Sequence, residues 1–132
     1  MKEQVYLLEQ GEFLFLAAAP GIQRLYGFEL KTEELKRESA LLLLQDLTAK
    51  GYLSVMEEHM QTTEPLRSMF LQMEEAETVM EIHKKSGRTC IIYLGAGAVR
   101  VSRSLCRNKR LELQRIPREE VWFYLNEEGW IL

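Results

Sequence analysis

Apolar residues recur at helical spacing through the first half of the chain. The segment EFLFLAAA, residues 12–19, predicts a buried helix, which Pro20 and Gly21 end. The short apolar run QVYLL, residues 4–8, precedes it and fits a strand or a helix equally well. The chain therefore begins with one undecided element and one helix.

A second helix is predicted over residues 33–50, where leucines dominate. Thr32 is a suitable N-cap, and Lys50 followed by Gly51 forms a stop signal. The leucines that share its broad apolar face are Leu35, Leu41, Leu42, Leu43, Leu44 and Leu47. Because this face is so wide, we expect the helix to be buried on much of its circumference.

A third helix is predicted after Thr63, which is a good cap, with Pro65 in its first turn. Its apolar stripe consists of Leu66, Met69, Phe70 and Met73. Met60 lies just before this helix, and three methionines in one region are compatible with an adaptable binding groove. We favour the simpler interpretation that all three fill the core.

From residue 78 the apolar pattern changes from helical to alternating, which is typical of strands. The predicted strands are TVMEIHKK (78–85), the two arms of TCIIYLGAGAVRVSRS (89–104) and KRLELQRI (109–116). In the first strand Val79 and Ile82 are expected to face inward, with one slip in the alternation. In the last strand Leu111 and Leu113 share one face, and Glu112 and Gln114 share the other.

The middle segment predicts a hairpin with a Gly-Ala-Gly turn at residues 95–97. After this turn Val99 and Val101 are expected to face inward, and Arg100 and Ser102 to face outward. GAGAV also resembles a phosphate-binding loop, but such a loop opens a helix, and here a strand follows.

The C-terminal segment PREEVWFYLNEEGWIL predicts a short helix that begins at Pro117 and ends at Gly129. Val121 and Leu125 are expected to share a face with Trp122. The whole chain, residues 1–132, is therefore predicted to form a single globular α+β domain. Its N-terminal helices pack on a small antiparallel sheet with a C-terminal helix.

The composition and net charge of the chain limit which classes of function are expected. The chain is 46% hydrophobic and 28% charged with a net charge of −3, which favours neither nucleic acid nor an anionic membrane. No stretch approaches the roughly 18 apolar residues that a membrane span needs. Glu3, Glu9 and Glu12 place acid where a signal peptide needs positive charge. We therefore expect a cytoplasmic protein.

Residues for catalysis or metal binding form no recognisable pattern. Cys90 and Cys106 lack metal-ligand or redox spacing and are expected to be reduced, and His59 and His83 stand alone. Ser102 lies in no nucleophile motif. We expect no enzymatic activity, no cofactor and no metal.

The segment TEELKRESALLLLQDLTAKGYL, residues 32–53, resembles part of a helix-turn-helix domain. A DNA-reading helix is rich in Arg, Lys, Asn or Gln, and a basic β-wing follows it in winged-helix proteins. Here three basic residues stand against four acidic ones from Glu33 to Lys50, and the next segment is acidic and predicted to become helical. DNA binding through this helix is not expected.

Basic residues are concentrated instead between Lys84 and Arg118, where ten Lys or Arg residues accompany one acidic residue. The cluster on the predicted hairpin and the following loop consists of Arg100, Arg103, Arg107, Lys109 and Arg110. Three interpretations stay open: a nucleic-acid surface, a solvated basic edge that prevents strand pairing, or a docking surface for an acidic partner. Tyr93 is the only aromatic residue in this range, which weakens the first.

The densest aromatic stretch, VWFYLNEEGWIL, lies at the C-terminus. Most of it is expected to pack in the core. Surplus aromatic area at a terminus is also a plausible interface anchor. Tyr124 and Trp130 are therefore candidate residues of a partner or dimer surface.

The order of elements from residue 28 to residue 125 resembles the first half of EspG-like proteins, which are cytosolic chaperones associated with type VII secretion. The segments that carry the resemblance are FELKTEELKRESALLLLQDLTAKGYL, EPLRSMFLQMEEAE, TVMEIHKK, CIIYLGAGAVRVSR and RLELQRI. Family members usually carry two such units, whereas this chain has one. The resemblance implies a small helical secreted protein as partner, and a homodimer would rebuild the two-unit arrangement.

The predicted function is therefore a non-enzymatic cytosolic protein-binding module, either an adaptor or a chaperone. The alternative is a nucleic-acid-associated regulator that uses the basic hairpin between Lys84 and Arg118.

Overall fold

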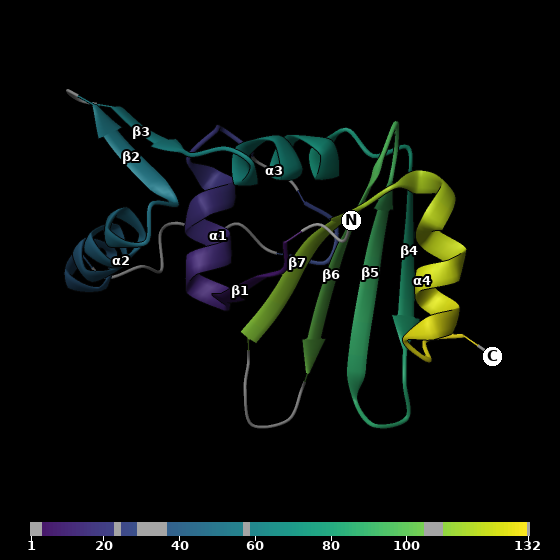
Figure 1. Cartoon of the computed structure of the whole chain (residues 1–132). Helices are drawn as coiled ribbons and strands as arrows, with labels where there is room; N and C mark the ends of the chain where they lie inside the picture. Colours follow the sequence, from purple (N-terminus) through teal and green to yellow (C-terminus); the bar gives the residue numbers. More distant parts are fainter. Residues whose placement is uncertain (1–3, 23–24, 29–36, 57–58, 105–109, 132) are drawn as a thin grey trace.

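A five-stranded antiparallel sheet forms the centre of the fold (Figure 1). The computed structural model describes residues 4–22, 25–28, 37–56, 59–104 and 110–131. The helices are α1 (Gln10–Ala18), α2 (Arg37–Ala49), α3 (Leu66–Glu74) and α4 (Val121–Glu127), the last preceded by a 3-10 turn, η2 (Arg118–Glu120). The strands are β1 (Tyr6–Glu9), β2 (Leu53–Met56), β3 (His59–Thr62), β4 (Thr78–His83), β5 (Arg88–Leu94), β6 (Ala98–Ser104) and β7 (Arg110–Ile116).

The strands of the main sheet follow the order β1-β7-β6-β5-β4. The predicted α+β class is confirmed, and so is the β5–β6 hairpin, in which Leu94 lies opposite Ala98 across the Gly-Ala-Gly turn. The undecided run near the N-terminus is a strand, because β1 pairs with β7. Since β6 lies at the centre of the sheet, its basic residues do not form the solvated edge that was one interpretation of the sequence.

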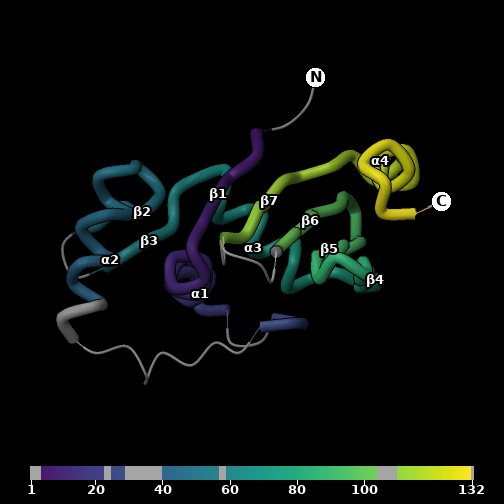
Figure 2. Tube along the Cα trace, turned by 90° about the horizontal axis from the view of Figure 1, so that it is seen from below, coloured from purple at the N-terminus to yellow at the C-terminus, as the bar shows by residue number. Residues whose placement is uncertain are grey.

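The inner face of the sheet carries α1 and α3 (Figure 2). The predicted α3 stripe is confirmed, since Leu66, Met69, Phe70 and Met73 are all buried. The ring of Phe70 contacts that of Phe13 from α1, with 5.1 Å between centroids. Beneath them lie Ile91, Tyr93, Val99 and Val101 of β5 and β6. Alternating apolar residues of the strands and the apolar faces of two helices thus form the main core.

The outer face carries α4, which packs on a second, smaller core. Val121 and Leu125 are one helical turn apart and are both buried there, beside Cys90 and Ile92 of β5. Arg100 and Ser102 do alternate with the inward valines, but the prediction that they face solvent is wrong. They are only 5% and 3% exposed, because α4 covers their part of the outer face.

Strand β4 has apolar contacts on both faces. Val79 packs against the inner core, whereas Met80 and Ile82 pack against the outer core. The predicted inward orientation of Ile82 is therefore wrong. The alternation does not slip, and the pattern is irregular because both faces of this strand meet apolar side chains.

Helix α2 is much less buried than its leucines suggested. Leu47 is fully buried, but Leu42 is 66% exposed and Leu41 is 53% exposed. The helix lies beside α1, outside the main sheet, so only one of its sides meets the core (Figures 1 and 2). The prediction of burial around much of its circumference is wrong. Thr32 and Leu35 lie outside the described residues.

Strands β2 and β3 form a hairpin where the sequence predicted an acidic segment leading into a helix. Val55 lies opposite Met60, and both are exposed, so the assignment of Met60 to the core is wrong. The hairpin is anchored at its base, where Leu53 and Thr62 are buried and the Thr62 hydroxyl donates to the carbonyl oxygen of Leu16 at 2.7 Å.

The N-terminus of α3 differs from the sequence prediction. The Thr63 hydroxyl does not cap α3 but donates to the carbonyl oxygen of Gly51 at 2.6 Å, and Pro65 occupies the N-cap position.

In the C-terminal helix α4, Trp122 is 63% exposed, so it does not share the buried face of Val121. Gly129 ends the segment with a φ of 73°, as expected for a helix stop. No helix within the described segments has the length and apolarity needed to cross a membrane.

Candidate binding groove

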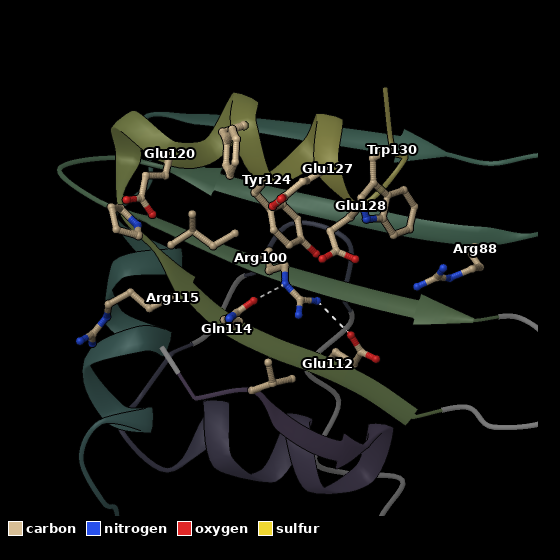
Figure 3. Close-up of a pocket in the computed structure, with 14 residues that line it drawn as sticks. Arg88, Arg100, Glu112, Gln114, Arg115, Glu120, Tyr124, Glu127, Glu128 and Trp130 are labelled. Carbon is tan, nitrogen blue, oxygen red and sulfur yellow. Dashed lines mark hydrogen bonds and ion pairs between the residues drawn. The ribbon is translucent and has the colours of Figure 1, made fainter. Parts of the chain in front are cut away.

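A groove of about 240 Å³ runs along the outer face between α4 and β7 (Figure 3). We call it the α4–β7 groove. Its lining residues are Val5, Arg88, Arg100, Glu112, Gln114, Arg115, Ile116, Pro117, Glu120, Phe123, Tyr124, Glu127, Glu128 and Trp130. They come from the residue before β1, from strands β5, β6 and β7, and from the C-terminal segment. The groove therefore exists only in the folded chain.

The floor of the groove is built around Arg100. Its Nε donates to Oε1 of Gln114 at 2.8 Å, and its Nη1 donates to Oγ of Ser102 at 3.0 Å and Oε2 of Glu112 at 3.1 Å. These bonds hold the planar guanidinium in one orientation (Figure 3). A buried cation is costly unless it is paired and hydrogen-bonded, and this network supplies both.

The sheet register places these polar residues together. Arg100 of β6 lies directly opposite Gln114 of β7, and Ser102 lies opposite Glu112. Residues two apart on a strand share a face, so all four side chains project from the outer face. The cluster therefore follows from the alternation of β6 and β7 and the pairing between these two strands.

Aromatic side chains form one wall. The guanidinium carbon of Arg100 lies 5.1 Å from the ring centroid of Tyr124, within range of a cation–π contact. Burial raises the pKa of Tyr124, and the positive charge of Arg100 opposes this shift. Trp130 contacts two further cations, with Lys84 Nζ at 4.6 Å and the Arg88 guanidinium carbon at 5.1 Å from its ring centroid.

Exposed apolar residues lie on both rims of the groove. Phe123 on α4 is 65% exposed, and Val5 and Leu7 at β1 are 40% and 53% exposed. Leu7 lies opposite Glu112, which places it on the outer face beside the groove. The core beneath α4 includes residues of four strands: Met80 and Ile82 of β4, Cys90 and Ile92 of β5, Ala98 of β6 and Ile116 of β7. Within the described residues no helix covers this face over β1 and the first part of β7, where Leu7 is 53% exposed and the side chain of Glu112 is 42% exposed.

The α4 side of the groove is acidic. Glu120, Glu127 and Glu128 are exposed, and none forms an ion pair with another residue of the described segments. Glu127 and Glu128 extend from the end of α4 over the groove (Figure 3). Lys84 approaches this end, but its Nζ contacts the carbonyl oxygen of Glu128 at 3.4 Å. The cations of the lining are already engaged by Glu112, by Trp130 and, for Arg115, by Gln72 of α3 at 3.2 Å.

Three of the residues predicted from the sequence meet in this groove: Arg100, Tyr124 and Trp130. Arg103 does not, because it lies on the inner face, 5.9 Å from the ring of Phe28. Arg110 is exposed at the start of β7 and does not line the groove. Arg107 and Lys109 lie outside the described residues. The predicted basic cluster is therefore divided between the two faces of the sheet.

Sequence reasoning missed Val5, Gln114 and Phe123 as lining residues. The alternation of β7 had placed Gln114 on the face opposite the leucines, which was a usable signal. Nothing in the sequence indicated that Val5 would lie close to Phe123, since their proximity depends on the pairing of β1 with β7.

The chemistry that the groove can offer follows from its side chains. The described residues contain no group of three or more Cys, His, Asp or Glu side chains arranged to hold a metal ion. The nearby thiol of Cys90 is free and buried, and this burial raises its pKa, which disfavours the reactive thiolate. What the groove offers is a fixed polar floor, an aromatic wall and an apolar rim.

A second hollow, of about 470 Å³, lies on the β2–β3 hairpin and is lined by Ser54, Met56, His59 and Gln61. It lacks a buried polar group that could orient a ligand, so the α4–β7 groove is the stronger candidate. No protein-family model, curated protein sequence or solved structure matches the chain.

Proposed function

We propose that the chain is a non-enzymatic protein-binding module, an adaptor or a chaperone, and that the α4–β7 groove receives part of its partner. The observation that carries this proposal is the half-covered outer face of the sheet. Phe123 and Leu7 remain more than half exposed there, on either side of a floor whose central group, Arg100, is already fixed. Apolar area around ordered polar groups is typical of binding surfaces.

The resemblance to EspG-like proteins supports the same class of function, with a small helical secreted protein as the proposed partner. We also propose a cytoplasmic location. The free thiol of Cys90, which is not engaged in a disulfide, fits a reducing compartment.

The alternative function, a nucleic-acid-associated regulator, is less well supported by the basic residues that the structure describes. Arg100 is buried and bonded to Glu112, whereas Arg103 lies on the other face of the sheet. A nucleic-acid surface requires several cations that reach phosphates from one side.

Two adjacent aromatic residues allow a matched test. Trp122 and Phe123 are 63% and 65% exposed, but only Phe123 lines the groove. A photo-crosslinking residue, p-benzoylphenylalanine, is placed at position 123 or, as the control, at position 122, and nuclease-treated lysate of the native cells is irradiated. We expect a defined protein adduct from position 123 and little from position 122. Equal adducts at both positions, or none at position 123, would contradict the proposal.

A further inference from the structure

We propose that the occupant of the α4–β7 groove is a basic amphipathic helix of a partner protein, which lies beside α4 over β7 and β1. This inference rests on the proposed function and specifies the shape and charge of the bound segment.

The width of the uncovered face matches one helix. Neighbouring strands are about 4.8 Å apart, so two strand spacings are nearly 10 Å. Packed helices lie roughly 8–10 Å apart, axis to axis. The core beneath α4 reaches Ile116 at the end of β7, so the uncovered part of this face lies over β1 and the first part of β7, which are two neighbouring strands. The inner face of the same sheet already carries two helices, whereas the described outer face carries one.

A helix also suits the floor better than an extended segment does. The outer face offers side chains, including Gln114, Glu112 and Leu7, because the backbone groups of β7 are paired within the sheet. An extended chain lying on this face would find no ladder of backbone partners. A helix satisfies its own backbone hydrogen bonds and needs only an apolar stripe to pack on the face.

The charges specify which helix fits. Its apolar stripe would contact Phe123, Leu7 and Val5, while its flank would lie against the acidic side of α4. Glu120 and Glu127 are two helical turns apart, and Glu128 follows directly. These carboxylates have no ion-pair partner in the described part of the chain. Lysine or arginine residues on the flank would pair with them, whereas an acidic helix would be repelled.

The test uses three fluorescent peptides with the intact protein. The first is a model amphipathic helix with a leucine stripe and lysines elsewhere; the second carries glutamates in place of the lysines; the third has the first peptide's composition in scrambled order. Binding is measured by fluorescence anisotropy. We expect the lysine peptide to bind at least tenfold more tightly than either of the others.

Groove variants locate the binding. The triple variant Glu120→Gln, Glu127→Gln and Glu128→Gln removes the acidic wall. We expect it to weaken binding of the lysine peptide by about tenfold, because three exposed ion pairs with the peptide would be lost. The control triple, Glu74→Gln, Glu75→Gln and Glu119→Gln, changes the net charge equally at exposed positions outside the groove and should leave the affinity within about twofold.

The apolar contact is tested with Phe123→Ser against the control Trp122→Ser. Only the first should weaken the lysine peptide, and amide spectra of both variants report whether the fold is retained. Failure of the lysine peptide to bind, or equal effects of the two triple variants, overturns the inference about the basic helix. If position 123 still crosslinks to a protein in that case, the proposed function stands with an occupant of different chemistry. A dimer that Phe123→Ser dissociates would instead identify the occupant as a second copy of the chain.

Discussion

Nη1 of Arg100 lies 3.1 Å from Oε2 of Glu112, yet the two side chains differ greatly in exposure, at 6% and 42%. The carboxylate is half hydrated, whereas the cation depends on its protein partners. Loss of Arg100 would leave a solvated carboxylate at Glu112. Loss of Glu112 would leave the buried cation of Arg100 without a counterion.

We predict that Glu112→Gln lowers the free energy of unfolding by about 1–2 kcal/mol, because Arg100 then stays buried without a counterion. Urea unfolding measures the change. Glu119→Gln, at an exposed position on η2, is the control and should change the stability by less than about 0.5 kcal/mol. Equal effects of the two substitutions would show that Arg100 does not depend on this carboxylate.

The two kinds of leucine on α2 should respond differently to truncation. Leu47→Ala removes a fully buried side chain from the core and should cost about 2–5 kcal/mol, whereas Leu42→Ala, at a 66% exposed position, should cost less than about 0.5 kcal/mol. Both variants lose the same number of carbon atoms from α2 and gain the same alanine, so helix propensity cancels in the comparison. Urea unfolding of the two variants checks this. A comparable loss from Leu42→Ala would mean that its side of α2 is covered in solution.

Two glycines with similar backbone angles allow a steric effect to be separated from a conformational one. Gly21 and Gly27 have φ values of 92° and 85°, so an alanine at either site should cost about 1–2 kcal/mol. A Cβ at Gly21 meets open space, but at Gly27 it would lie 2.8 Å from Cδ1 of the buried Ile91. We therefore expect Gly27→Ala to lower the free energy of unfolding by about 1 kcal/mol more than Gly21→Ala does. Equal thermal unfolding midpoints for the two variants would contradict it.

Alkaline pH should destabilise the protein through its buried tyrosines. Burial raises the pKa of Tyr93, whose hydroxyl donates to the carbonyl oxygen of Tyr26, and also raises the pKa of Tyr124. A raised pKa in the folded state means that the unfolded chain binds fewer protons above its own tyrosine pKa of about 10. The stability is thus fully present below pH 10 or so and falls as pH rises toward the folded-state values, by about 1.4 kcal/mol per pH unit for each such tyrosine.

Unfolding in urea as a function of pH measures this slope. Tyr93→Phe lacks one of the two titrating groups, so it should be less stable at neutral pH but should lose stability less steeply above pH 10 or thereabouts. An unchanged alkaline slope in Tyr93→Phe would show that Tyr93 is not the source.

The sequence predicted the sheet region well because its signals are local. Alternating residues such as Val99 and Val101, and the Gly-Ala-Gly turn, locate the hairpin without reference to the rest of the chain. The same locality explains the main error on β6. Whether Arg100 faces water depends on α4, which lies far along the chain, and no pattern in the strand itself encodes that cover.

Errors on the α2 side have a different cause. Leucine spacing shows which residues share a face, but burial requires a second element against that face, and α1 contacts only part of it. The β2–β3 hairpin was missed because Val55 and Met60 are exposed, so its strands lack the alternation of buried and solvated residues that marks a strand in a sequence. Of the groove, the sequence suggested Arg100, Tyr124 and Trp130 separately, but their meeting depends on tertiary structure.

The pairing of β1 with β7 joins two strands that are far apart in the sequence, since Tyr6 lies opposite Leu113. During synthesis on the ribosome β1 emerges long before β7, and residues 10–109 must follow it before the two strands can pair. Contacts so distant in sequence also slow folding. Before β7 is synthesised, Leu8 and the other apolar residues of β1 have no partner strand. A nascent or truncated chain that ends before β7 therefore exposes an unpaired apolar strand, which can aggregate with other chains.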